Sequence, residues 1–126
     1  MSAPRSTLLH ATAIALAVDA DGPLAGVLLV GPSGAGKSAL ALAAIEACPF
    51  RRTALIADDQ AVIAAAGAVS APEALQGLIE VRGYGPARVR SVKSARLVAA
   101  FDLGLDAPRI PEIETRSFAP GADLPV

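Results

Sequence analysis

Apolar runs separated by short polar breaks make up most of the first hundred residues. The run LLHATAIALAV (8–18) partly alternates apolar and polar positions, which favours a β-strand. GVLLV (26–30) is continuously apolar, which is typical of a strand buried on both faces. Between them, the Asp-Gly and Pro of DADGPL (19–24) predict a turn of the kind that links adjacent strands.

The middle of the chain predicts one helix and a second buried strand. KSALALAAIEAC (37–48) has a helix-forming composition and no breaker before Pro49. TALIADD (53–59) reads as a buried strand that ends in two acids. QAVIAAAGAVSAP (60–72) fits a strand pair around Gly67 or a short strand followed by a turn, and the pattern does not separate the two.

The second half predicts further strands and then a tail. GLIEVRGYG (77–85) reads as a strand closed by glycines. ARVRSVKSARLVAAFDLG (87–104) alternates valine with basic residues before an apolar stretch, which predicts a strand followed by a helix. Four prolines after position 107 argue against regular structure there. We therefore expect one α/β domain with a mixed sheet over residues 1–106 and a Pro-rich tail over 107–126.

Composition narrows the class of protein further. The chain has 126 residues, which suits one domain, and only 3% aromatic residues, so its core should consist of small Ala, Val, Leu and Ile contacts. A net charge of −1 gives no general attraction to nucleic acid or to an anionic membrane. The single Cys48 excludes an internal disulfide and suits a reducing compartment.

The N-terminal segment has some features of a secretory leader. Arg5 precedes the first apolar run, and VDA at 18–20 could pass for a cleavage site, but His10 interrupts the apolar stretch. No apolar stretch approaches the roughly 20 residues that span a bilayer. We therefore expect a cytoplasmic protein with no membrane or nucleic-acid partner.

The segment GPSGAGKS (31–38) matches the pattern G-x-x-x-x-G-K-[ST] between a predicted buried strand and a predicted helix. Glycines let successive backbone N–H groups approach phosphate oxygens, and the helix directs its positive end at the same anion. Lys37 would reach the β- and γ-phosphates of ATP, and the Ser38 hydroxyl would ligate Mg²⁺. The candidate nucleotide-binding residues are Gly31, Ser33, Gly34, Ala35, Gly36, Lys37 and Ser38. The loop indicates a nucleotide but not a reaction, because transport ATPases, switches and kinases all use it.

Asp58 and Asp59 follow directly after the second buried strand. In open α/β sheets ligands bind at the carboxyl ends of strands, where the glycine-rich loop also lies. One acid could hold Mg²⁺, and the other could accept the proton of an attacking hydroxyl. Adjacent side chains of an extended strand point in opposite directions, so the two roles should differ. A solvated turn is the alternative explanation for the pair.

Four segments in fixed order, His10, GPSGAGKS, LIADD and GLIEVRGYG, resemble the catalytic domain of HPr kinase/phosphorylase. The resemblance spans roughly residues 8–90. It implies a P-loop kinase domain over 1–106 that transfers phosphate from ATP, with Mg²⁺, to a serine of an HPr-like phosphocarrier protein of a phosphotransferase system. It also implies the reverse phosphorolysis to pyrophosphate and a cytoplasmic hexamer.

The same resemblance implies a role for each matched acid and base. Asp58 matches the catalytic aspartate that takes the serine proton, and His10 matches the histidine near it. Arg82 matches the signature arginine beside the phosphates. Glu80 matches the second acid of the Mg²⁺ site, and Asp59 would support the metal or the loop. Glu80 and Arg82 are two apart and so share a strand face, which suits this site but also a surface salt bridge.

Three features depart from the family pattern. Ala39 stands where an acid is common, and GPARVR (85–90) stands where aliphatic residues usually follow. The last twenty residues contain no convincing counterpart of the family's mobile loop and C-terminal helices, so phosphorolysis or the usual HPr recognition could be altered. A small-molecule kinase or other P-loop NTPase, and a non-catalytic nucleotide-binding regulatory module, are the alternative functions.

The segment from Arg82 to Arg96 carries five cations and no acid. It could be a docking patch for an acidic partner surface, or a strand with a solvated basic face. The second interpretation is the simpler one.

Overall fold

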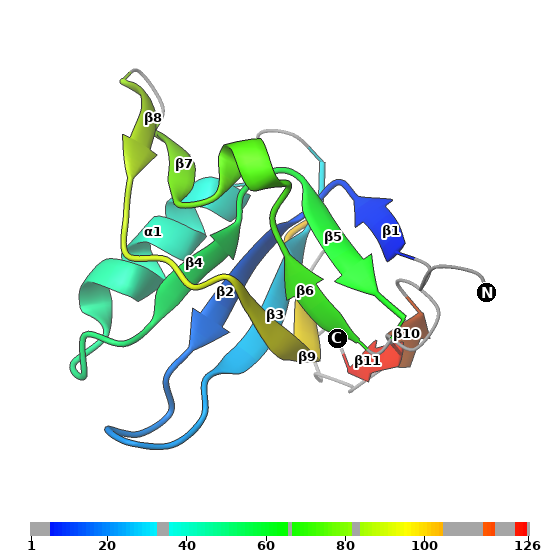
Figure 1. The fold of residues 1–126 in the computed structure, drawn as a ribbon, viewed down its shortest axis with the longest axis horizontal. Helices are drawn as coiled ribbons and strands as arrows, with labels where there is room; N and C mark the ends of the chain where they lie inside the picture. Colours follow the sequence, from blue (N-terminus) through cyan, green and yellow to red (C-terminus); the bar gives the residue numbers. More distant parts are fainter. Residues whose placement is uncertain are drawn as a thin grey trace.

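The computed structural model describes residues 6–32, 36–65, 67–81, 84–104, 115–117 and 123–125. In this part of the chain a seven-stranded sheet has the order β1-β5-β6-β9-β3-β2-β4, and β7–β8 and β10–β11 each form a two-stranded sheet (Figure 1). The elements are β1 (Ser6–Leu9), β2 (Thr12–Leu16), β3 (Ala25–Val30), α1 (Lys37–Ala47), β4 (Ala54–Ala57), β5 (Ala61–Ala64), β6 (Ala68–Ser70), a 3₁₀ turn η1 (Glu73–Leu75), β7 (Leu78–Val81), β8 (Gly85–Arg88), β9 (Ser94–Asp102), β10 (Thr115–Ser117) and β11 (Asp123–Pro125).

The centre of the fold is β3, which confirms the prediction of a buried strand. It pairs in parallel with β9 and antiparallel with β2, so the sheet is mixed, as predicted. Val27 and Leu29 pack on the face that α1 covers, whereas Leu28 and Val30 pack on the opposite face. This alternation follows from the two-residue period of a strand, and it explains why the whole run is apolar.

The first predicted strand, over 8–18, is wrong as a single element. The chain instead forms β1, which pairs with β5 at one edge of the sheet, and β2, which lies between β3 and β4 near the other edge. His10 and Ala11 carry the chain across this change of partners. The apolar pattern continues through the break because Ala11 is itself fully buried.

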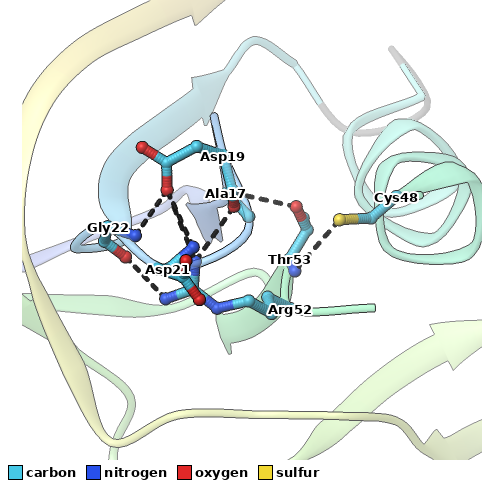
Figure 2. Close-up of polar contacts among 7 residues, drawn as sticks. All are labelled: Ala17, Asp19, Asp21, Gly22, Cys48, Arg52 and Thr53. Carbon is cyan, nitrogen blue, oxygen red and sulfur yellow. Dashed lines mark hydrogen bonds and ion pairs between the residues drawn. The ribbon is translucent and has the colours of Figure 1, made fainter. Parts of the chain in front are cut away.

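The turn predicted at DADGPL links β2 and β3 and is held by side chains on both sides (Figure 2). The Asp19 carboxylate accepts hydrogen bonds from the backbone N–H groups of Asp21 and Gly22. Arg52 donates to the carbonyls of Asp19, at 3.0 Å, and Gly22, at 2.5 Å. The turn is therefore attached to the segment that leads into β4.

The alternative left open at 60–72 is settled as a strand pair. β5 and β6 pair antiparallel around Gly67, which has a φ of 86°. L-residues with side chains rarely adopt this left-handed conformation, so glycine suits the turn.

The helix predicted after the basic alternation does not form. β9 is instead one strand of nine residues, paired with β3 over Leu97–Asp102 and with β6 over Ser94–Arg96. Sheet pairing on both edges overrides an Ala-rich composition that is compatible with a helix. At the start of this pairing Gly26 allows the two strands to approach, because a Cβ there would lie 2.6 Å from the Arg96 carbonyl oxygen.

The tail predicted after residue 107 to lack regular structure contains two short strands. β10 and β11 pair antiparallel, and Leu124 of β11 is buried in the core cluster beneath β9. Leu124 therefore attaches the hairpin to the domain, and Pro125 pairs with Thr115 in a sheet of only two strands, where a proline is tolerated.

One cation of the basic stretch has a structural role. The Arg90 guanidinium donates to the carbonyl of Ile45, in the last turn of α1, and to that of Thr53, both at 2.9 Å. It therefore satisfies a carbonyl near the negative end of the helix. Arg88, Lys93 and Arg96 are exposed, as the interpretation of a solvated basic face expects.

Candidate active site

A cleft of about 1020 Å³ opens where β4 ends and α1 begins. The hairpin of β7 and β8 stands beside α1 (Figure 1), and residues of both line the cleft. One end of the cleft is polar, with Lys37, Ser38, Asp58, Asp59 and Glu80. Apart from Gln60 the other lining residues are apolar or glycine, and they include Leu42, Leu75, Leu78, Ile79, Val81 and Pro86. The cleft can therefore hold a molecule with one charged and one apolar part.

Gly36 is the N-cap residue of α1, whose first residues line the polar part of the cleft. Its φ of 96° lies in the left-handed region, and its carbonyl accepts the first helical hydrogen bond, from the N–H of Leu40 at 2.9 Å. Among the described residues no side chain caps this helix end. The amides of the first turn are therefore free to bind an anion. The predicted loop residues Ser33, Gly34 and Ala35 lie outside the described residues.

Lys37 is a buried cation at this helix end, with only 6% of its surface exposed. Its ammonium donates to the carbonyl of Gly31 at 2.6 Å, and within the described chain it pairs with no carboxylate. A buried charge without a counter-ion is unfavourable. The position therefore favours an anionic ligand in the cleft.

The Asp58 carboxylate is 8% exposed and accepts three hydrogen bonds. Its Oδ1 accepts from the Ser38 hydroxyl at 2.6 Å and from the Thr12 hydroxyl at 3.0 Å. Its Oδ2 accepts from the backbone N–H of Glu80 at 2.7 Å. A carboxylate has about four acceptor positions, so Asp58 retains one on Oδ2.

The Asp59 side chain does not share the partners of Asp58 but lies against His10. Its φ of 69° turns the backbone directly after Asp58, and its Oδ1 lies 3.3 Å from Nε2 of His10. Both side chains of this pair are more than half exposed. The left-handed turn therefore separates two adjacent acids: Asp58 lies against the start of α1, and Asp59 lies beside the junction of β1 and β2.

Of the predicted site residues that the structure describes, six line the cleft together: Gly36, Lys37, Ser38, Asp58, Asp59 and Glu80. Glu80 lies on β7, lines the cleft and is bonded to Asp58 through its backbone. Arg82 lies outside the described residues. Thr12 is a contact that sequence reasoning missed, because a threonine in an apolar strand resembles any other β-branched residue.

The donor atoms at this end of the cleft fit Mg²⁺. Hydroxyl and carboxylate oxygens are its preferred ligands, and it is commonly held by one or two carboxylates together with substrate phosphates. The Ser38 hydroxyl and the carboxylates of Asp59 and Glu80 belong to residues that line the same cleft. Within the described chain no three His, Cys, Asp or Glu side chains form a metal cluster.

The protein has a mixed α/β fold. Its cleft, where β4 ends and α1 begins, is lined by the buried Lys37 and by the acids Asp58, Asp59 and Glu80. Residues 9–101 match the family described as HPr Serine kinase C-terminal domain. Because this match covers more than half of the chain, the protein belongs to the HPr serine kinase family. The resemblance found in the sequence is thereby confirmed.

Among solved structures, 19 chains match. One is the Hpr(Ser) kinase/phosphatase from Coxiella burnetii, with a TM-score of 0.68 and 22% sequence identity, over 94% of this chain and 82% of that chain. At this identity the likeness shows the fold. No match was found among curated protein sequences.

Within the described chain, no helix is long and apolar enough to span a bilayer.

Cys48 lies at the opposite end of α1 from the cleft, and its surroundings favour the thiolate (Figure 2). A hydrogen bond from the Thr53 side chain, with the backbone amides of Arg52 and Thr53, lowers the pKa of the Cys48 thiol to about 6. Because this pKa is lower in the folded chain than in the unfolded chain, the contacts stabilise the fold at high pH. That stabilisation is lost as the pH falls towards 6.

We expect alkylation of Cys48 by iodoacetamide to be half-maximal near pH 6, since the thiolate is the nucleophile. Thr53→Val should move this midpoint upward, because it removes the main cause of the shift. Alkylation rates across pH, followed by mass spectrometry, test both expectations. A midpoint near that of an ordinary thiol, about 8.5, in the unmodified protein would contradict them.

Proposed function

We propose that this protein is an ATP- and Mg²⁺-dependent serine kinase that acts on an HPr-like phosphocarrier protein. The observation that carries the proposal is the placement of Asp58 and Ser38. Their hydrogen bond puts a nearly buried carboxylate at the helix end where Lys37 also lies. Membership of the HPr serine kinase family supports this assignment.

The start of α1 would bind the phosphates of ATP. Lys37 would exchange its bond to the Gly31 carbonyl for one to the β- and γ-phosphates, which supplies the missing counter-ion. The free amides of the first helical turn, and those of Ser33, Gly34 and Ala35, would cradle the same oxygens. When bound, Mg²⁺ neutralises charge on the β- and γ-phosphates, and Ser38, Glu80 and Asp59 are the proposed residues around it.

Asp58 would act as the general base. Its remaining acceptor position on Oδ2 takes the proton of the substrate serine while the serine oxygen attacks the γ-phosphorus and the bond to ADP breaks. In the reverse direction Asp58 returns the proton to the serine oxygen while inorganic phosphate attacks the phosphoserine, which yields pyrophosphate. His10 would orient Asp59 beside this centre, and Arg82 would stabilise charge on the transferred group.

The apolar wall of the cleft would receive the substrate segment around the serine. This apolar lining comes from η1, from the β7–β8 hairpin and from Leu42 of α1. We further propose cytoplasmic location, assembly into a hexamer, and no nucleic-acid or membrane partner.

The decisive experiment incubates the protein with γ-labelled ATP, Mg²⁺ and the HPr-like protein of the same cell, and then maps the labelled residue by mass spectrometry. We expect label on one serine of the carrier and none when Mg²⁺ is chelated. Release of inorganic phosphate without protein labelling would favour a P-loop NTPase or a small-molecule kinase. Nucleotide binding with neither activity would favour a regulatory module.

A further inference from the structure

Thr12 begins β2 and is fully buried, with 0% of its surface exposed. Its hydroxyl occupies a point where three strands converge on the cleft. It donates to Oδ1 of Asp58 at 3.0 Å, and it accepts the backbone N–H of Asp59 at 3.3 Å. A buried hydroxyl in an apolar strand is costly unless it is hydrogen-bonded, and here both of its functions are used.

The bond from Asp59 fixes the direction in which Thr12 donates. An N–H cannot accept, so the lone pair of the Thr12 oxygen points towards Asp59, and its single proton is directed to Asp58. The carboxylate is thereby held from two sides at Oδ1, by Thr12 and Ser38, and from a third at Oδ2, by the N–H of Glu80. Of these three donors, Thr12 alone also binds the backbone of the turn after Asp58.

Branching at Cβ makes Thr12 a stiff anchor. A threonine in a strand has few accessible χ1 rotamers, so its hydroxyl is held in place by the backbone of β2. β2 is itself hydrogen-bonded on both edges, to β3 and to β4. The position of the Asp58 carboxylate is therefore tied to a strand inside the sheet, where Thr12 pairs with Leu29 of β3.

We infer that Thr12 is a positioning residue. It sets the orientation of the Asp58 carboxylate and holds the left-handed turn at Asp59, so that the free acceptor position on Oδ2 stays directed into the cleft. The consequence for phosphate transfer rests on the function proposed above. The geometric part concerns the protein alone and can be measured without substrate.

The test compares Thr12→Val, which keeps the shape and removes the hydroxyl, with Thr12→Ser, which keeps the hydroxyl. Thr53→Val is the matched control, because Thr53 is as deeply buried, accepts an N–H from Ala17 and lies before the opposite end of β4. If Thr12→Val does not fold, as judged by circular dichroism, Thr12→Ala takes its place. Thermal melting of every variant separates general destabilisation from the local effect.

The first measurement is amide hydrogen exchange, by NMR, in the free protein. We expect exchange at Asp59 and at Glu80 to accelerate about tenfold or more in Thr12→Val, while Thr12→Ser and Thr53→Val retain the original rates there. The Glu80 amide reports on the carboxylate itself, because it bonds to Asp58 and not to Thr12. Unchanged exchange at Glu80 in Thr12→Val would overturn the inference.

The second measurement is phosphate transfer to the carrier. We expect kcat to fall about ten- to a hundredfold in Thr12→Val, with the KM for ATP within about twofold, and Thr12→Ser to restore most of the rate. An unchanged kcat would overturn the role of Thr12. If the unmodified protein labels no serine, the proposed function fails, and the exchange data still decide whether Thr12 positions Asp58.

Discussion

Asp58→Asn is expected to reduce phosphate transfer to the carrier serine by about 10²- to 10⁴-fold, the range of a lost general base. The amide is neutral and cannot take the serine proton. Its oxygen can still accept the N–H of Glu80, and the hydroxyl of Ser38 can rotate to accept from its NH₂ group, so that of the three bonds only the one from Thr12 is lost. The fold and the affinity for nucleotide should therefore be largely retained.

Single-turnover transfer from labelled ATP, together with calorimetric titration of nucleotide, separates the two effects. Asp21→Asn is a matched control, because Asp21 is an exposed acid in the turn between β2 and β3. Asp59→Asn tests the neighbouring acid, whose side chain pairs with His10. Near-normal transfer by Asp58→Asn with complete loss in Asp59→Asn would move the proton acceptor from Asp58 to the His10–Asp59 pair.

Lys37→Ala is expected to weaken nucleotide binding and transfer together. The variant removes the charge-assisted bond to the β- and γ-phosphates, so affinity for ATP should fall about tenfold or more. Transfer should fall about 10²- to 10³-fold, as when one donor to a transition-state anion is lost. Removal of a buried, uncompensated cation should leave the free energy of unfolding unchanged or raised.

Calorimetry with ATP and Mg²⁺, and transfer assays at saturating nucleotide, measure these effects. Lys93→Ala is the matched control, since Lys93 is exposed on the segment before β9. Affinity and rate equal to those of the unmodified protein would remove Lys37 from the site. Loss of affinity alone, with full transfer at saturation, would indicate that Lys37 binds the ground state and the transition state equally.

The parts of the fold that the sequence predicted correctly are those with one dominant local signal. β3 and β4 are short apolar runs buried on both faces, and α1 follows a glycine with no breaker for eleven residues. The errors occurred where tertiary contacts decide. β9 forms a strand because β3 and β6 pair with it, and the chain breaks at His10 because β1 and β2 have different partners.

The candidate site shows the same difference between residues with a local sequence signal and residues whose roles depend on tertiary contacts. Spacing indicated Lys37 and Ser38, and the acids at the end of a buried strand indicated Asp58, because both patterns are local. Glu80 was placed by resemblance, and its backbone bond to Asp58 could not be foreseen, since it depends on how the β7–β8 hairpin docks. Thr12 and Arg90 gave no sequence signal: their roles depend on contacts with residues 46 and 45 positions away along the chain.

The β7–β8 hairpin forms its own two-stranded sheet, and Asp58 is bonded to its backbone at Glu80. The hairpin also packs through Ile79 against the core on the helix side, so the Asp58 carboxylate is one of its attachments to the rest of the domain. As the proposed base, Asp58 would take up a proton, and it would then accept the N–H of Glu80 more weakly. Proton transfer to the proposed base and release of the phosphorylated partner would then be coupled through this one hydrogen bond.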